Sequence, residues 1–339
     1  MKLLVIILNY RVTDLTIDCL RSLAPEIPRI PGVKVAVCEN GTGVDAEQRL
    51  RDAISVNGWE PWVELTAISP NRGFTGGNNV IIREAMAGSD PPDCFLLLNA
   101  DTIVQPGALA ALVDFMDRTP EAGIAASRLE NFDGSEQGSA YRFYNVANEV
   151  EGAIRLGTVS RLLAKHVVCF PMPKAACEVD WVPGCSMIIR RKVIESIGPL
   201  DEDYYNYFDD IDYCWNARRA GWPVWFVPAS RVLHLDGAST EITSRIIKRR
   251  PRYWFQARRR FWLKNYGPVQ AALADAAFIV GYALWRIRRF IQRKVDNDPP
   301  HFLADFIRNS VFVTGFKLRV VQNPAMVQAL AKGVNGDKQ

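Results

Sequence analysis

Three separate segments of the 339-residue chain contain side chains that could bind a divalent metal ion and remove a proton. Asn99-Ala100-Asp101 directly follows the apolar run 95–98, a cluster of aspartates spans 209–212, and a single histidine, His234, lies further on. Carboxylates are oxygen ligands of Mg²⁺ and Mn²⁺, which also take substrate phosphates, and histidine is a frequent metal ligand. We therefore expect these segments to form one site for chemistry on a nucleoside diphosphate.

The aspartates Asp209, Asp210 and Asp212 stand where a helix is predicted to begin. One acid there would cap the helix and stabilise it by about 0.5–2 kcal/mol, and capping is the simple structural explanation. Three acids are more than capping needs, and crowding raises the pKa of at least one carboxylate. Because a carboxylate with a raised pKa is suited to general-base catalysis, the cluster predicts a proton acceptor.

Residues 71–79, Asn-Arg-Gly-Phe-Thr-Gly-Gly-Asn-Asn, form a loop rich in glycines and amides before a predicted helix. Glycines let backbone N–H groups approach a phosphate, a helix N-terminus favours anions, and Arg72 adds a charged donor. The segment matches neither the phosphate-binding loop of NTPases nor the Gly-x-Gly-x-x-Gly dinucleotide fingerprint. It predicts diphosphate binding, with a plain turn before a helix as the alternative.

Alternating strands and helices are predicted to position these residues. Apolar runs predict strands at 3–8, 33–38, 63–68, 95–98 and 123–126, with helices from Asp14, over 74–87 and from Pro106. Such alternation implies right-handed crossovers and a parallel sheet, whose ligands bind at the carboxyl ends of the strands. The pattern is lost over 130–180. Further elements are then predicted at 180–189, 193–197, 212–220, 224–227 and 231–233.

The composition is that of a globular protein, with 48% hydrophobic and 23% charged residues, and the length allows about two domains. The net charge of +4 hides an asymmetry, because residues 244–294 contain 14 Lys or Arg and one acid. Seven cysteines without a C-x-x-C pair, and only three histidines, argue against structural zinc and for reduced thiols in the cytoplasm. The apolar run 3–8 is too short for a signal peptide or a membrane span.

Six segments of the chain, in their order along the sequence, resemble the inverting nucleotide-sugar glycosyltransferases of family 2, and most of all their rhamnosyltransferase-type members. The matching segments are 6–10, 39–42, 71–79, 98–101, 198–212 and 234–239, within about residues 3–265. Each segment alone is a weak signal, whereas the ordered set is specific. The resemblance implies the GT-A fold: an α/β architecture with a mixed, mostly parallel sheet flanked by helices, here followed by a C-terminal helical extension.

The resemblance also implies roles for fourteen residues. The general base would be Asp210, with Asp209 as the alternative because it replaces the family's usual glutamate. Asp101, the last acid of the family's Asp-x-Asp motif, and His234 would hold Mg²⁺ or Mn²⁺ through the donor diphosphate. Nucleotide-sugar binding is expected of Asn9, Tyr10, Glu39, Arg72, Gly73, Asn79 and Asn99. Trp181, Gly184 and Asp212 are expected on the acceptor side.

The implied reaction is metal-dependent, inverting transfer of a sugar, a rhamnose-like deoxyhexose favoured, in cell-surface polysaccharide synthesis. The donor would be a nucleoside-diphosphate sugar, and the acceptor a glycan or polyprenyl-linked hydroxyl. We expect a catalytic domain over 1–245, with a nucleotide-sugar half (1–130) and an acceptor and base half (131–245), before a basic helical extension (246–339).

Two other functions are suggested by parts of the sequence. A sugar nucleotidyltransferase would normally show a glycine-rich signature with Arg and Lys after the first strand, which residues 9–13 lack. A non-enzymatic nucleic-acid-binding protein could use the basic segment 244–294, but the acidic cluster would then have no role. We therefore expect no nucleic-acid partner.

Residues 265–285 contain a single charged side chain, that of Asp275. Arg286, Arg288 and Arg289 follow this segment. A membrane-spanning helix would bury Asp275 near the bilayer centre at a cost of ~2.5–3.5 kcal/mol, whereas a helix lying at the membrane interface avoids that cost. We expect 266–294 to attach peripherally to an anionic surface on the cytoplasmic face of the inner membrane. Packing against the catalytic body, or against a partner in a homodimer, are the alternatives.

Overall fold

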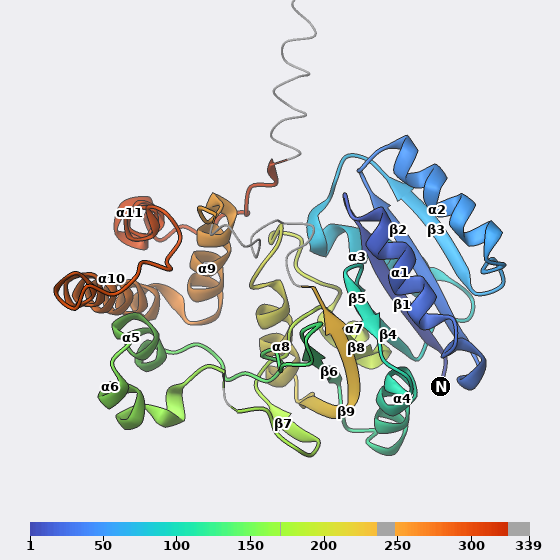
Figure 1. Ribbon diagram of the computed structural model, residues 1–339, viewed down its shortest axis with the longest axis horizontal. Helices are drawn as coiled ribbons and strands as arrows, with labels where there is room; N and C mark the ends of the chain where they lie inside the picture. The colour runs from blue at the N-terminus through green and yellow to red at the C-terminus, as the bar shows by residue number, and fades with distance from the viewer. Residues whose placement is uncertain (170, 236–247, 325–339) are drawn as a thin grey trace, which may run out of the picture.

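The computed structural model describes residues 1–169, 171–235 and 248–324 (Figure 1). In these ranges a nine-stranded sheet has the order β3-β2-β1-β4-β8-β6-β9-β5, and β7 pairs with β9. The strands are β1 (Leu3–Asn9), β2 (Val33–Asn40), β3 (Val63–Ile68), β4 (Cys94–Asn99), β5 (Thr102–Val104), β6 (Ile124–Glu130), β7 (Cys177–Val179), β8 (Ser186–Arg190) and β9 (Val224–His234). The longest pairings are parallel, so the sheet is mixed and mostly parallel, as predicted.

Helices cover both faces of the sheet because consecutive side chains of a strand point to opposite faces. In β1, the fully buried Val5 and Ile7 belong to one apolar core and Ile6 belongs to the other. The first core also contains residues of α1 (Thr13–Leu23), α2 (Val44–Val56) and α4 (Ala108–Arg118). The second contains residues of α3 (Gly73–Ala87), α7 (Arg191–Ile197) and α8 (Asp209–Arg219).

Several elements differ from the predicted ones, and the short strand β5 was not predicted. Helix α2 was not predicted, because its buried stripe is limited to Ala46, Leu50 and Ile54. The two strands expected at 224–227 and 231–233 are one strand, β9. Its pairing with β6 shifts register between Ser127 and Arg128, which lets the chain pass Pro228 without a regular hydrogen bond there. The unassigned stretch 130–180 contains α5 (Val146–Ile154), α6 (Gly157–Leu162) and β7.

A helical group on one side of the sheet follows β9 in the sequence (Figure 1). It comprises α9 (Arg252–Asn265), α10 (Gly267–Ile291), α11 (Phe302–Asn309) and α12 (Val311–Thr314), and two short 3-10 helices lie elsewhere at Ile27–Arg29 and Ala164–His166. Helix α10 packs against α5 and α9. The buried Arg258 of α9 pairs with Glu149 of α5 at 2.9 Å and with Asp275 of α10 at 2.5 Å. This ion-paired cluster joins the C-terminal helices to the segment between β6 and β7.

Candidate active site

The pairing of two strands brings Asp101 and His234 together. Asp101 lies between β4 and β5, and β5 runs antiparallel to the end of β9 with Thr102 opposite His234. The backbone N–H of Leu235 donates to the Asp101 carbonyl at 3.0 Å and extends this ladder. As a result, Asp101 Oδ1 lies 3.4 Å from His234 Nε2, although 133 positions separate the residues in the sequence. Both side chains are buried.

This pair fits one divalent ion. Carboxylate and imidazole atoms 3.4 Å apart can both reach an ion at the usual metal–ligand distance of about 2.1 Å. Within the described ranges, no group of three or more His, Cys, Asp or Glu side chains gathers as a complete metal cage. Two protein ligands leave coordination positions for phosphate oxygens and water, which is the way that Mg²⁺ is usually bound beside a nucleotide.

The aspartates at the start of α8 face the same region. Strand β8 pairs with β4 so that Ser186 lies opposite Leu98, which brings Gly184 and Cys185 beside Asn99. The Gly184 N–H then donates to Asp210 Oδ2 at 3.2 Å, and the Ile211 N–H donates to Asp210 Oδ1 at 2.8 Å. The Asp210 carboxylate is therefore held between the segment that precedes β8 and the first turn of α8.

Burial makes the two neighbouring carboxyls weak acids. Burial raises the pKa of Asp210 to about 6, although the N–H groups of Ile211 and Gly184 partly offset it. The pKa of Asp209 is raised well above its ordinary value by burial and then by the charge of Asp210. A carboxylate whose pKa is near 6 is unprotonated at neutral pH and still accepts a proton readily, as a general base must.

The segment before α8 is held tightly against the glycine-rich loop. Tyr207 and Phe208 both have left-handed backbone angles, with φ of 67° and 61°, which non-glycine residues rarely adopt. The Phe74 N–H donates to the Tyr205 carbonyl at 2.9 Å, and a Cβ on Gly73 would lie 2.3 Å from that carbonyl oxygen. Gly73, whose φ is +75°, is therefore required both for its backbone angle and for this close approach.

A cavity of about 530 Å³ connects these groups. Nine of the fourteen residues assigned from the sequence line it: Tyr10, Gly73, Asn99, Asp101, Trp181, Gly184, Asp209, Asp210 and His234. Aromatic side chains that sequence analysis did not assign also line it, namely Phe74, Tyr144, Tyr205, Tyr207, Phe208, Tyr253 and Trp254. Of these, Tyr253 and Trp254 belong to the family-like segment before 265, which was the available sequence signal for them.

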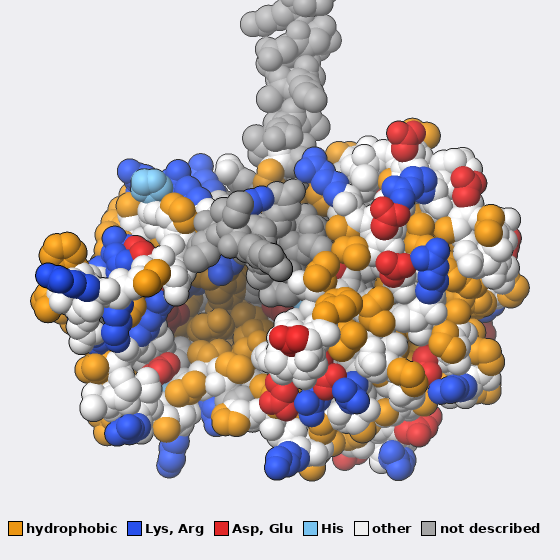
Figure 2. Space-filling view, viewed as in Figure 1, with side chains coloured by type: hydrophobic (Ala, Val, Ile, Leu, Met, Phe, Trp, Pro, Cys, Tyr) orange, Lys and Arg blue, Asp and Glu red, His pale blue; other side chains and the backbone are white. Residues whose placement is uncertain are grey.

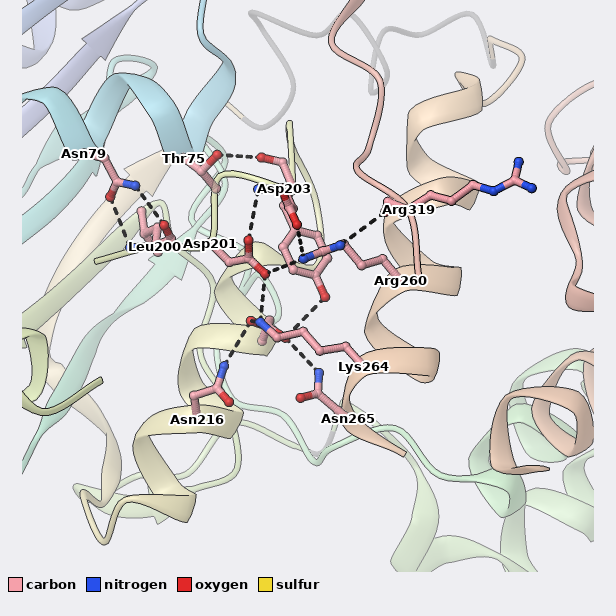
Figure 3. A network of polar contacts seen from close by, with 12 residues as sticks. Thr75, Asn79, Leu200, Asp201, Asp203, Asn216, Arg260, Lys264, Asn265 and Arg319 are labelled. Carbon is pink, nitrogen blue, oxygen red and sulfur yellow. Dashed lines mark hydrogen bonds and ion pairs between the residues drawn. The ribbon is translucent and has the colours of Figure 1, made fainter. Parts of the chain in front are cut away.

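Four assigned residues lie outside the cavity lining on the donor side. Asn79 hydrogen-bonds the Leu200 backbone in both directions (Figure 3). It also donates to Glu202 Oε1, so it ties α3 to the 200–202 segment. Glu39 accepts the N–H groups of Gly41 and Thr42 and turns the chain after β2. The remaining two are Asn9, which accepts the Thr16 hydroxyl, and Arg72, which is exposed.

Asp212 is also outside the cavity lining, and its carboxylate contacts Lys264 and Asn265 at the end of α9. Lys264 Nζ lies 2.6 Å from Asp212 Oδ2, and Asn265 Nδ2 donates to Oδ1 at 2.8 Å. Tyr204 and Asn216 complete its hydrogen bonds at 3.2 and 3.0 Å. With 2% of its surface exposed and four partners, Asp212 joins α8 to α9 instead of facing the acceptor side of the cavity. Residues 236–239 of the His234 motif lie outside the described residues.

Comparisons with known proteins agree with this fold. The model of the family "Glycosyltransferase like family 2" matches residues 2–259, so the chain belongs to glycosyltransferase family 2. The chain is 29% identical over 234 residues to an N-acetylglucosaminyl-diphospho-decaprenol L-rhamnosyltransferase of Mycobacterium tuberculosis (strain H37Rv), covering 65% of this chain and 70% of the relative. It is 23% identical over 164 residues to the rhamnosyltransferase WbbL of Escherichia coli (strain K12), covering 48% and 60%.

Solved structures share the fold at low sequence identity. GalNAc-T7, solved with UDP, GalNAc and Mn²⁺, has a TM-score of 0.57 at 12% identity, over 93% of this chain and 59% of its own length. The mannosyltransferase PcManGT of Pyrobaculum calidifontis, solved with GDP-Man and Mn²⁺, has a TM-score of 0.52 at 14% identity, over 100% and 88%. The chain thus has the GT-A fold and is a rhamnosyltransferase-like glycosyltransferase that acts in glycan synthesis.

Proposed function

We propose that the chain transfers a rhamnose-like deoxyhexose from a nucleoside diphosphate to a hydroxyl of a lipid-linked glycan, with inversion, in cell-surface polysaccharide synthesis. The main support is that the Asp101–His234 pair and Asp210 line one cavity, although they come from three distant segments. The rhamnose-like donor and the polyprenyl-linked acceptor rest on the rhamnosyltransferase relatives, one of which is named for a diphospho-decaprenol acceptor.

Asp101 and His234 would hold Mg²⁺ or Mn²⁺ together with the donor diphosphate. A bound divalent ion would neutralise the negative charge that develops on the leaving nucleoside diphosphate. The chain's own residues hold the reactants in place. Tyr10 and Gly73, which line the cavity, would contact the donor, and Trp181, which lines it together with Asp210, would contact the acceptor.

Asp210 acts as the general base in a single displacement. Its carboxylate takes the proton of the acceptor hydroxyl while that oxygen forms a bond to the anomeric carbon. The bond from the anomeric carbon to the phosphate oxygen breaks on the opposite face, and its electron pair leaves with the nucleoside diphosphate. Since one displacement inverts the centre, no enzyme nucleophile is needed, and the base contributes about 10²–10⁴-fold to the rate.

A panel of nucleotide sugars tests the proposal directly. With Mn²⁺ and a short polyprenyl-diphosphate-linked acceptor, the protein should release nucleoside diphosphate from a deoxyhexose donor and form one glycoside of inverted configuration, as seen by NMR. Chelation by EDTA should abolish release, and added Mn²⁺ should restore it. Formation of a nucleotide sugar and pyrophosphate from a nucleoside triphosphate and a sugar phosphate would instead support the nucleotidyltransferase alternative.

The same proposal includes peripheral attachment of the protein to an anionic membrane through α10. Among the described helices, α10 is the one long and apolar enough to cross a bilayer. One face of α10 packs against the rest of the protein. On this face Asp275 is buried, pairs with Arg258 and accepts the Val311 N–H at 2.7 Å. A helix anchored in this way is suited to lie along a membrane and not to cross it.

The outer face of α10 is apolar along its length. Its exposed side chains include Val269, Leu273, Val280, Leu284, Ile287 and Ile291, each between 49% and 73% exposed. Basic side chains gather next to apolar ones over the helical group that contains α10 and α11 (Figure 2). This combination favours anionic lipid over a second protein copy, and cytoplasmic placement would bring the cavity to a polyprenyl-linked acceptor.

Vesicle flotation distinguishes the possible occupants of this face. The protein should float with vesicles that contain phosphatidylglycerol and float less with phosphatidylcholine alone. The double variant Val280→Glu/Leu284→Glu should remain in solution, whereas Val56→Glu, at an exposed apolar position on α2, should bind as the parent does. A parent protein that ignores vesicles but dissociates from dimer to monomer on this double substitution would assign the face to a second copy.

A further inference from the structure

We propose that Gln137 is a positioning residue that fixes the tautomer of His234, so that the Nε2 lone pair points toward Asp101. The inference rests on the proposed metal-binding role of His234 for its functional consequence. Its structural content, the position of one proton on one imidazole ring, can be measured without metal or substrate.

The orientation of the Gln137 side-chain amide is determined by its neighbours. Gln137 Nε2 donates to the backbone carbonyl of His234 at 2.7 Å and to Asn131 Oδ1 at 2.7 Å. A backbone carbonyl can only accept a hydrogen bond, so the amide nitrogen must face it. Rotation of the amide by 180° would place Oε1 against that carbonyl oxygen and lose both bonds.

The fixed amide leaves Oε1 as the partner of the imidazole. Gln137 Oε1 lies 3.2 Å from His234 Nδ1. Because an amide oxygen only accepts, Nδ1 must be the nitrogen that bears the proton in the neutral ring. Nε2 then has a free lone pair, 3.4 Å from Asp101 Oδ1 and 3.4 Å from Asn99 Nδ2.

Gln137 works against the preference that Asp101 alone would impose. A carboxylate next to Nε2 attracts a proton to that nitrogen, and a protonated Nε2 cannot bind a metal ion. The Gln137 acceptor at Nδ1 favours the opposite tautomer. A hydrogen-bond partner on the second imidazole nitrogen is the usual means by which proteins orient a metal-binding histidine, and its loss typically weakens metal binding about 10–100-fold.

The backbone around Gln137 is built to hold this side chain. The Gln137 N–H donates to the Leu129 carbonyl at 2.9 Å, and the Asn131 N–H donates to the Ser135 carbonyl at 2.8 Å. These bonds close a tight turn at the end of β6, which is paired with β9, the strand that ends at His234. Gln137 therefore approaches the imidazole from the turn after β6, on the Nδ1 side of the ring and not on the side of Asp101.

The tautomer can be read by ¹H–¹⁵N long-range NMR of the metal-free protein at about pH 8, above the ordinary pKa of imidazole. The chain has three histidines, and a His234→Asn variant identifies the signal of His234. We expect the pattern of an Nδ1-protonated ring in the parent. An Nε2-protonated ring in the parent would overturn the proposal without any need for a variant at 137.

Substitutions then test the cause. Gln137→Met should shift His234 toward the Nε2-protonated form. The matched control Glu136→Gln, at the exposed neighbouring position, should retain the parent tautomer. An unchanged tautomer in a folded Gln137→Met protein would contradict the assignment.

Metal affinity separates this inference from the proposed function. Mn²⁺ titrated alone and followed by EPR should bind about 10–100-fold more weakly to Gln137→Met than to the parent. If the parent shows the expected tautomer but binds no Mn²⁺, the metal role of His234 fails and the positioning by Gln137 stands. Equal Mn²⁺ affinity in Gln137→Met despite an altered tautomer would overturn the functional consequence proposed here.

Discussion

Two groups of aspartates, a few residues apart in the sequence, have opposite surroundings. Asp201 and Asp203 face α9, where Arg260 and Lys264 pair with them at 2.6–3.0 Å (Figure 3). Asp212 belongs to the same group, because Lys264 also pairs with it, at 2.6 Å. Asp209 and Asp210 face the cavity, and the hydrogen bonds to the Asp210 carboxylate come from backbone N–H groups. The first group fastens a helix to its neighbour, whereas the second is free to exchange a proton with a substrate.

The pKa values follow from this difference. Burial disfavours the Asp201 carboxylate, but the hydrogen bonds from Lys264 and Arg260 more than offset it, and its pKa lies below the ordinary value. Burial of Asp210 is offset only in part by two N–H groups, so its pKa is raised to about 6. Whether α9 supplies a cation therefore determines whether an aspartate has a lowered pKa, as Asp201 does, or a raised pKa that suits the proposed base, as Asp210 does.

The largest effect is expected from Asp210→Asn, which removes the base and keeps the shape of the side chain. The amide can still accept from the Gly184 N–H through its oxygen, so the fold and donor binding should persist. The transfer rate should fall about 10²–10⁴-fold, the usual contribution of a general base. Steady-state kinetics with donor affinity measured in parallel would check this, and a variant that transfers sugar at the parent rate would exclude Asp210 as the base.

Asp212→Ala should act on stability, because it leaves the Lys264 ammonium without its buried partner. Lys264 keeps its ion pair with Asp201 at 2.8 Å, so the expected cost is that of buried hydrogen-bonding groups left without a partner, about 1–3 kcal/mol, and urea unfolding measures the loss. Asp203→Ala, at a side chain that is 45% exposed, is the matched control and should cost less than about 1 kcal/mol. Parent-like stability of Asp212→Ala, with a raised KM for the acceptor, would return Asp212 to the acceptor role first expected of it.

The sequence predicted cavity residues correctly where they lie at the end of a strand. Asp101 and His234 stand directly after apolar strands, and strand ends meet at one edge of a sheet, so their proximity could be anticipated. The split between Asp210 and Asp212 could not, because it depends on Lys264 and Asn265 from a helix more than fifty residues later. The periodicity of a helix shows which of its faces is buried, but not which distant helix packs against that face.

The same limit explains other differences. Asn79 has the residue type of a phosphate ligand, yet the Leu200 backbone satisfies its amide, a contact across 121 positions. Gln137 lies in a turn whose polar sequence gives no regular period, and its role depends on the neighbouring end of β9. The tail 266–294 was expected at a membrane, and the structure adds that its one acid, Asp275, is used inside the protein. The predicted boundary at 245 lies outside the described residues.

The pH dependence of transfer should reflect the cavity pair and not the α9 group. Because Asp210 must be ionised to accept a proton, kcat should rise with pH through about 6 and then level off. Stability should run the other way. A carboxyl whose pKa is raised on folding favours the folded state fully below its unfolded pKa, and this contribution is lost as pH rises through about 6. Thermal unfolding of Asp210→Asn should lack this decline between about pH 4 and 6, and an unchanged decline would assign it to other groups.

The smallest effect is expected from Asp209→Asn. Burial and the neighbouring Asp210 charge raise the pKa of Asp209 well above its ordinary value, which favours its protonated form. Asparagine mimics that neutral form, and the rate of transfer should stay within about threefold of the parent, less than the 10²-fold minimum for loss of a base. The rise of kcat should also stay near pH 6, because asparagine keeps the neutral state that burial favours at position 209. A loss of transfer in Asp209→Asn as large as that in Asp210→Asn would mean that the two carboxyls share one proton and act as a unit. The cavity would then contain a coupled pair of carboxyls and not a single base.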